Sequence, residues 1–169
     1  MKRISPSEIK DNSFNLIGKS WMLVSAGNLE RINCMTASWG GFGVLWNKNV
    51  AFIFVRPVRY TYEFIERSEY FSLSFFDEKH RGILEYCGKV SGRNSDKVKV
   101  MSLHPEMHDG KSPLYEEARL SIICKKIYYS DLDPKHFLID DIESNYPHSD
   151  YHRMYVGEIT DVLVNDQKL

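Results

Sequence analysis

The sequence VAFIFVRPVRYT at residues 50–61 joins a buried strand to the start of a helix. Residues 50–55 are all apolar and mostly β-branched or aromatic, which predicts a strand that is buried on both faces. Pro57 lies just before residues 59–68, where apolar side chains recur at helical spacing, and proline is common near a helix start. The junction therefore places Arg56, Arg59 and Thr61 at the N-terminus of a predicted helix.

The rest of the pattern is mostly strands. Residues 71–76 (FSLSFF) alternate apolar side chains with serine, which predicts a half-buried strand. A second helix is predicted over residues 77–88, because Asp stands at its start and Gly at its end. Strands and helices do not alternate regularly, so a mixed or antiparallel barrel with inserted helices fits better than a doubly wound parallel sheet. Further strands are predicted over residues 16–25, 31–39, 118–129 and 155–164, and a loop over residues 104–113.

Length and composition indicate a single domain over residues 1–169. The formal net charge of −1 excludes a basic excess, and the longest apolar run is far shorter than the roughly 20 residues that span a bilayer. We therefore expect neither nucleic-acid nor membrane binding. The N-terminal cations precede no apolar stretch, so no secretory signal is expected. Three widely spaced cysteines without a CxxC pair favour a cytoplasmic protein with reduced, mostly buried thiols.

Several familiar motifs are incomplete in this sequence. Gly110-Lys111-Ser112 resembles the end of a phosphate-binding loop, but Pro105 stands where that loop needs glycine. His104 and His108 are four residues apart, yet Pro105 disfavours the continuous helix that a zinc-binding HExxH motif requires. The acidic and histidine residues between positions 140 and 152 have no recognisable metal-ligand spacing. We therefore predict neither a nucleoside triphosphate site nor a metal site.

Two stretches remain as candidate ligand sites. In NCMTASWGG at residues 33–41, small and hydroxyl side chains interrupt a strand beside a glycine pair, so a flat ligand can approach the backbone. The alternative is a tight corner of a barrel. Arg56, Arg59 and Thr61 at a helix N-terminus favour a phosphate, through the helix dipole and charge-assisted hydrogen bonds. The alternative is two ordinary surface arginines.

With these stretches the sequence resembles the flavin-reductase-like, FMN-binding split-barrel family, especially its flavoredoxin-like branch. The matching segments follow one another in order from about residue 15 to 165. Tyr151 is inserted into the last of them, and Ser74 stands where many reductases have asparagine. Besides residues 33–41 and 56–61, the matching segments are VLW at 44–46, FSLSFF at 71–76, SGRNSDK at 91–97 and YHRMYVGEI at 151–159.

The resemblance implies a six-stranded antiparallel split β-barrel with inserted helices, and a homodimer that binds FMN near the subunit interface. It implies that Met35, Thr36, Ala37, Ser38 and Trp39 line the flavin ring, and that Asn33 also binds the cofactor. It further implies that Arg56, Arg59 and Thr61 hold the phosphate, with Tyr60 packed nearby. Ser91 and Lys97 belong to a second segment that approaches the flavin, and His152 lies on the nicotinamide side.

The expected function is that of an FMN-dependent oxidoreductase, in which electrons from NAD(P)H or a protein donor pass through the flavin. The flavin supplies the redox chemistry, so no catalytic acid–base pair is required. One alternative is an FMN-binding or electron-carrier protein without NAD(P)H activity. Another is a structural domain that holds no cofactor.

Overall fold

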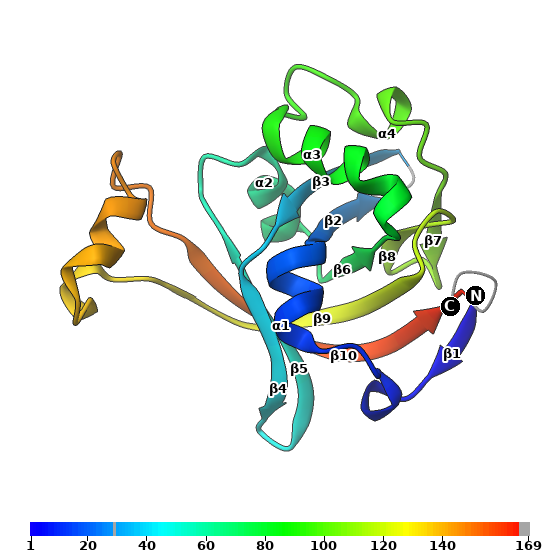
Figure 1. The fold of residues 1–169 in the computed structure, drawn as a ribbon, viewed down its shortest axis with the longest axis horizontal. Coiled ribbons are helices and arrows are strands. Elements are labelled where there is room, and N and C mark those ends of the chain that lie inside the picture. Colours follow the sequence, from blue (N-terminus) through cyan, green and yellow to red (C-terminus); the bar gives the residue numbers. More distant parts are fainter. Residues whose placement is uncertain (29, 166–169) are drawn as a thin grey trace.

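An antiparallel sheet forms the body of the protein (Figure 1). The computed structural model describes residues 1–28 and 30–165. Eight strands form this sheet, in the order β3-β2-β6-β9-β10-β5-β4 with β1 added beside β10. Its strands are β1 (Lys2–Ile4), β2 (Met22–Asn28), β3 (Arg31–Ala37), β4 (Gly40–Leu45), β5 (Lys48–Val55), β6 (Tyr70–Phe75), β9 (Leu120–Asp131) and β10 (Arg153–Val164).

The sheet order confirms a mainly antiparallel fold with few helices. Within the described residues the sheet does not close, because β3 and β4 form its two ends. It has two strands more than the six that the resemblance implied. The strand predicted over residues 50–55 is the second half of β5, which pairs with both β4 and β10. It is not fully buried on both faces, because Phe52 and Phe54 on one face are only half-buried.

The helices follow the predicted order. Helix α2 (Tyr60–Arg67) begins directly after its N-cap residue Arg59. Helix α3 (Arg81–Lys89) continues a 3-10 turn at Glu78–His80, for which Asp77 is the N-cap residue. Helix α4 (Lys97–Val100) is a single short turn that packs with α3 against β3. Of these described helices, none is long and apolar enough to cross a membrane.

Two segments form other elements than the sequence predicts. Residues 16–20 form a π-helical turn, Leu16–Ser20, that extends α1 (Ser13–Asn15), and β2 starts only after Trp21, whose φ is 67°. Residues 104–113 are not a loop, because they contain β7 (Pro105–His108) and the start of its partner β8 (Ser112–Tyr115). Asp109 and Gly110 both have positive φ in the turn, as Asp-Gly pairs commonly do in tight hairpins.

Strand β6 is buried on both faces, which corrects the prediction of a half-buried strand. Ser72 and Ser74 are as buried as Phe71 and Leu73. The Ser72 hydroxyl donates to the backbone carbonyl of Pro113, and the hydroxyl of Ser74 lies 3.4 Å from that of Ser121. Serine satisfies its hydroxyl inside the protein, so an alternating pattern does not require a solvent-exposed face.

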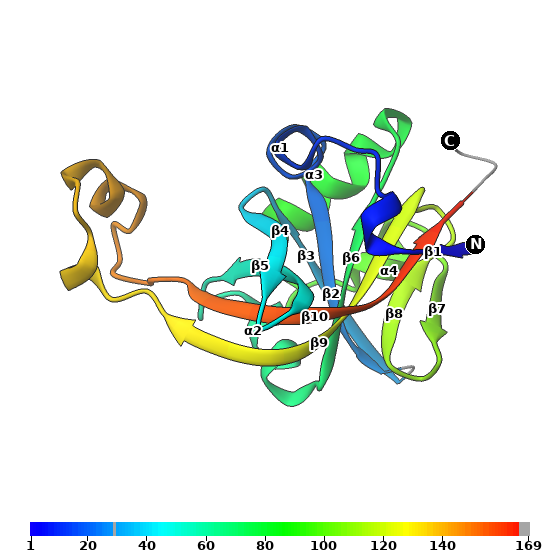
Figure 2. The ribbon, with the colours of Figure 1, turned by 90° about the horizontal axis from the view of Figure 1, so that it is seen from below.

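Residues 132–152, here called the arm, connect β9 to β10 and project away from the body (Figures 1 and 2). Short 3-10 turns at Pro134–His136 and Asp140–Asn145 give the arm its shape. Its base is tied to the residue after β5, because Arg56 forms an ion pair of 3.0 Å with Asp150 and donates to the carbonyl of Asn145 at 2.6 Å. The base of the arm therefore borders the junction where β5 leads into α2.

Candidate functional site

A cavity of about 420 Å³ opens where the end of β5, the start of α2 and the segment after α3 meet. We call it the cationic pocket because four of its side chains are arginine or lysine. Its lining residues are Met35, Arg56, Val58, Arg59, Tyr60, Thr61, Lys89, Val90, Ser91, Gly92, Lys97 and Asp150.

A second, smaller cavity of about 160 Å³ adjoins the cationic pocket. We call it the tryptophan recess, after Trp39. The two cavities share Met35, Arg56 and Arg59, so they form one elongated space. The recess is lined by Met35, Thr36, Ala37, Ser38, Trp39, Phe54, Arg56, Arg59 and His152.

Two cations of the pocket, Arg59 and Lys97, donate to carbonyls at the C-terminal end of α3, and Lys97 also donates to a carbonyl of β3. Nζ of Lys97 donates to the carbonyls of Cys34 at 2.6 Å and Cys87 at 3.1 Å. Nη1 of Arg59 donates to the carbonyl of Gly88 at 2.9 Å. The carbonyl end of a helix carries partial negative charge, so it attracts both side chains and fixes their direction.

The cationic pocket carries an excess of positive charge, which favours an anion, because its lining contains four cationic side chains and the carboxylate of Asp150. Burial lowers the pKa of Lys97, and burial together with the neighbouring Arg56 lowers the pKa of Arg59. Both shifts mean that the charged forms lack full compensation. In the part of the chain that the structure describes, no carboxylate contributes to either shift. Arg56 differs, because its guanidinium is already paired with Asp150.

The start of α2 is available to a ligand at the edge of this pocket. Its N-cap residue, Arg59, makes no capping hydrogen bond with its side chain. The first backbone N–H groups of a helix have no partner within the helix, and they are a common binding site for anions.

Thr61 and Asn33 form a buried hydrogen bond behind the pocket. Nδ2 of Asn33 donates to Oγ1 of Thr61 at 2.8 Å, which joins β3 to α2. Gly92 leaves room for this contact, since a Cβ at its position would lie 2.0 Å from Oδ1 of Asn33. Asn33 thus supports the site without lining either cavity.

His152 borders the tryptophan recess as a neutral imidazole. Its ring centre is 5.1 Å from that of Trp39, and its side chain is almost fully buried. Burial, with the positive charge of Arg56, lowers the pKa of His152 to about 4. Nδ1 lies 2.8 Å from the hydroxyl of Tyr146, a residue of the arm. When the phenol donates to Nδ1, Nε2 carries the ring hydrogen and acts as a donor.

The structure brings most of the predicted site residues together. All of them except Asn33 line the cationic pocket or the tryptophan recess. Ser74, the position that departs from the family pattern, is buried in β6 and lines neither cavity. The contacts of the predicted site residues with a cofactor remain a prediction.

Sequence reasoning missed several residues of the site. Lys89 and Gly92 lie beside the predicted Ser91, so their proximity in sequence was the available signal. Asp150 and Tyr146 come close to the site because the arm packs against it, and no local sequence pattern predicts that packing. Phe54 belongs to the strand predicted over residues 50–55, and it lines the recess from the half-buried face of that strand.

Comparison with known proteins identifies the family. Residues 15–169 match the flavin reductase like domain. No curated protein matches the sequence.

Solved structures share the fold at low sequence identity. Flavoredoxin from Methanosarcina acetivorans is 23% identical with a TM-score of 0.70, and the match covers 96% of this chain and 77% of that one. Flavoredoxin of Desulfovibrio vulgaris (Miyazaki F) is 22% identical with a TM-score of 0.69, covering 99% and 78%. The NADH:FAD oxidoreductase of Streptomyces globisporus C-1027 is 12% identical with a TM-score of 0.67, covering 89% and 78%.

These likenesses establish a split-barrel fold of the flavin-reductase-like type, with a sheet that stays open. The family match extends over most of the chain and includes every residue of the two cavities. The chain belongs to the flavin reductase like domain family.

Proposed function

We propose that this chain binds FMN, with the phosphate in the cationic pocket and the flavin ring in the tryptophan recess. The carrying observation is that Arg59 and Lys97 converge with Arg56 and Lys89 on one pocket, where among the described lining residues the one carboxylate, Asp150, is paired with Arg56. A phosphate would gain charge-assisted hydrogen bonds from both side chains and from the start of α2. The larger cavity alone, about 420 Å³, lies within the range of about 300–1,000 Å³ that is typical of ligand pockets.

The tryptophan recess suits the flat end of the same ligand. Small side chains at Thr36, Ala37 and Ser38 let a ring approach the backbone, while Trp39 and Met35 offer apolar contact. His152 offers a neutral polar group at the same edge. The side chains of the tryptophan recess would position the flavin ring and limit the access of water to it.

The proposed activity is that of an oxidoreductase. When bound, FMN supplies hydride-transfer and electron-transfer chemistry. The family supports this activity, as do the similar structures, which include flavoredoxins and an NADH:FAD oxidoreductase. The electron donor would be NAD(P)H or a redox protein. An FMN-binding electron carrier without NAD(P)H activity is the alternative.

We also propose that the protein is a cytoplasmic homodimer. Large apolar side chains are exposed on the hairpin of β4 and β5 and on the adjoining part of β9, where Trp46 contacts Tyr128 at 5.8 Å between ring centres. A cluster of exposed aromatic residues is typical of an interaction surface. Leu138 and Ile139 add exposed apolar side chains on the arm. The three cysteines are free thiols and form no disulfide bond, which fits a reducing compartment.

The test combines a spectrum with an activity assay. Purified protein is mixed with FMN and desalted, and its visible absorption is recorded. The holoprotein is then mixed with NADH or NADPH without oxygen. Retained flavin that bleaches with either nucleotide supports the oxidoreductase. Retained flavin that only dithionite bleaches supports a carrier that needs a protein donor. Protein that retains no flavin and oxidises no NAD(P)H with excess free FMN contradicts both.

A further inference from the structure

Two cysteines from distant parts of the sequence meet inside the protein. The sulfur atoms of Cys34 on β3 and Cys87 on α3 are 3.8 Å apart, and both residues are fully buried. Cys124 on β9 is also fully buried, and the cysteine–cysteine contact found among the described residues does not include it. The chain therefore contains one thiol pair and one matched isolated thiol.

The thiol pair lies directly behind the cationic pocket. Cys34 stands between Asn33 and Met35 in β3, and the ammonium of Lys97 contacts the backbone carbonyls of both cysteines. Thr36 of the same strand donates to the carbonyl of Leu84 in α3 at 2.5 Å. These bonds hold β3 and α3 in fixed register, so the two sulfur atoms have little freedom to separate.

We propose that Cys34 and Cys87 form a reversible disulfide, a second redox site in addition to the proposed flavin site. A disulfide bond is about 2.05 Å long, so the sulfur atoms must approach by less than 2 Å to form it. Cys124 lacks the neighbour that this reaction needs.

The proposed oxidant is hydrogen peroxide, because it is small enough to approach two buried thiols. The sulfur of Cys34 attacks one oxygen of peroxide, the O–O bond breaks, and the first water leaves. The sulfur of Cys87 then attacks the sulfur of Cys34, the S–O bond breaks, and the second water leaves. Each thiol loses its hydrogen, and peroxide accepts the two electrons.

The surroundings give the two thiols different roles. The hydrogen bond with Cys87 lowers the pKa of Cys34, and the Lys97 ammonium acts in the same direction against the effect of burial. The same hydrogen bond, together with burial, raises the pKa of Cys87. Cys34 also lines a cavity of about 550 Å³ and Cys87 does not, so Cys34 is the attacking sulfur and Cys87 the resolving one.

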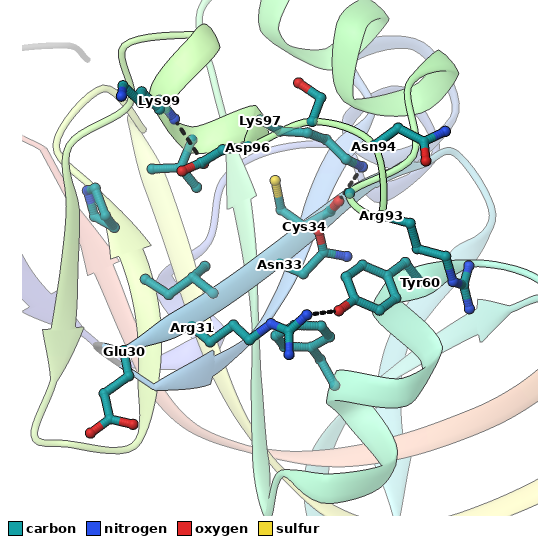
Figure 3. A pocket seen from close by; sticks show the side chains of 16 residues that line it. Glu30, Arg31, Asn33, Cys34, Tyr60, Arg93, Asn94, Asp96, Lys97 and Lys99 are labelled. Carbon is teal, nitrogen blue, oxygen red and sulfur yellow. Dashed lines mark hydrogen bonds between the residues drawn. The ribbon is translucent and has the colours of Figure 1, made fainter.

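A neighbouring cavity leads to this pair. It has a volume of about 550 Å³, is lined by Cys34 and Lys97, and shares Tyr60 and Gly92 with the cationic pocket. Figure 3 shows the sulfur of Cys34 directed from β3 toward the segment that carries Asp96 and Lys97. Cys34 therefore stands in the wall of this cavity, on the side from which a small oxidant would approach.

The test uses the wild-type full chain and peptide mass spectrometry. Folded protein is treated with hydrogen peroxide, then denatured and alkylated. Trypsin places the three cysteines in separate peptides, residues 32–48, 82–89 and 120–125. We expect the first two peptides to appear linked, with the loss of two hydrogens, while Cys124 stays fully alkylated. Dithiothreitol should restore both free peptides.

A variant identifies the attacking sulfur. In Cys87→Ser the resolving thiol is absent, so Cys34 should accumulate as a sulfenic acid that dimedone traps. Equal alkylation of all three cysteines in the treated wild type would overturn the proposal. Linkage to Cys124 would also overturn it. Both readouts are independent of flavin, so the failure of the proposed function would leave this test intact.

Discussion

The hydroxyl of Tyr146 lies 2.8 Å from Nδ1 of His152, which ties the arm to the tryptophan recess. Tyr146 also receives the guanidinium of Arg56 over its ring, at 5.3 Å from the ring centre. One tyrosine therefore contacts both a residue of the recess and a residue that the two cavities share. The position of the arm and the shape of the site are linked through this side chain.

Tyr146→Phe should free the imidazole of His152 while keeping the aromatic packing. We expect a loss of about 0.5–1.5 kcal/mol in the free energy of unfolding, the usual net value of one hydrogen bond. Urea unfolding measures this loss, and nitrogen NMR of His152 reports the tautomer, which should become mixed. Tyr128→Phe is the control, since Tyr128 is exposed and contacts Trp46 through its ring. Equal stability and an unchanged tautomer in Tyr146→Phe would refute the link.

His152 should make the protein less stable as the pH falls. Its pKa is lowered to about 4 in the folded state, so between about pH 6.5 and 4 the unfolded chain binds more protons. The free energy of unfolding therefore rises with pH across that window, by up to about 3 kcal/mol. Urea unfolding at several pH values should give a flatter profile in His152→Gln.

His104→Gln provides a control of opposite sign for this pH dependence. The hydrogen bond with Glu117 raises the pKa of His104, so its contribution to stability is present at low pH and is lost as the pH rises. The variant should therefore make the profile steeper, not flatter. A His152→Gln profile identical to that of the wild type would show that His152 is not buried as a neutral ring.

Arg59→Ala should weaken FMN binding ten- to a hundredfold. The variant removes one charge-assisted phosphate bond, which is worth about 1.5–3 kcal/mol. Quenching of flavin fluorescence measures the dissociation constant. Arg67→Ala is the matched control, because Arg67 lies on the same helix with 79% of its side chain exposed. Unchanged affinity in Arg59→Ala would remove this residue from the phosphate site.

Lys97→Met should affect both stability and FMN affinity. The substitution removes the buried amine, so the carbonyls of Cys34 and Cys87 lose their donor. We expect the free energy of unfolding to fall by about 1–3 kcal/mol. The pocket also loses one positive charge. Lys99→Met is the control, since Lys99 is an exposed residue of the same helix. A variant that loses stability but keeps its FMN affinity would make Lys97 purely structural.

The sequence predicted the parts of the fold in which local pattern and tertiary environment agree. The strand at residues 50–55 and the helix after Arg59 are such parts, because apolar periodicity and the start signal coincide. The strand predicted to start at residue 16 was wrong, because Leu16 and Ile17 bury their side chains from a π-helical turn. The hairpin at β7 and β8 carried its own signal, the Asp109-Gly110 turn, which the surrounding polar residues obscured.

The candidate site was predictable where its residues are close in sequence. Residues of both predicted segments, 35–39 and 56–61, line the elongated cavity. Tyr146 and Asp150 were beyond sequence reasoning, because the fold of the arm decides that they meet His152 and Arg56. The pairing of Cys34 with Cys87 likewise depends on how α3 packs on β3.

Equilibrium dialysis of the wild-type protein against FMN and against riboflavin tests the central claim most directly. The two ligands share the flavin ring, and only FMN carries the phosphate that Arg59 and Lys97 would bind. The account predicts one FMN bound per chain and an affinity for riboflavin at least about tenfold weaker, the loss of one or more charged hydrogen bonds. Equal affinity for the two ligands, or no binding of FMN, would contradict it.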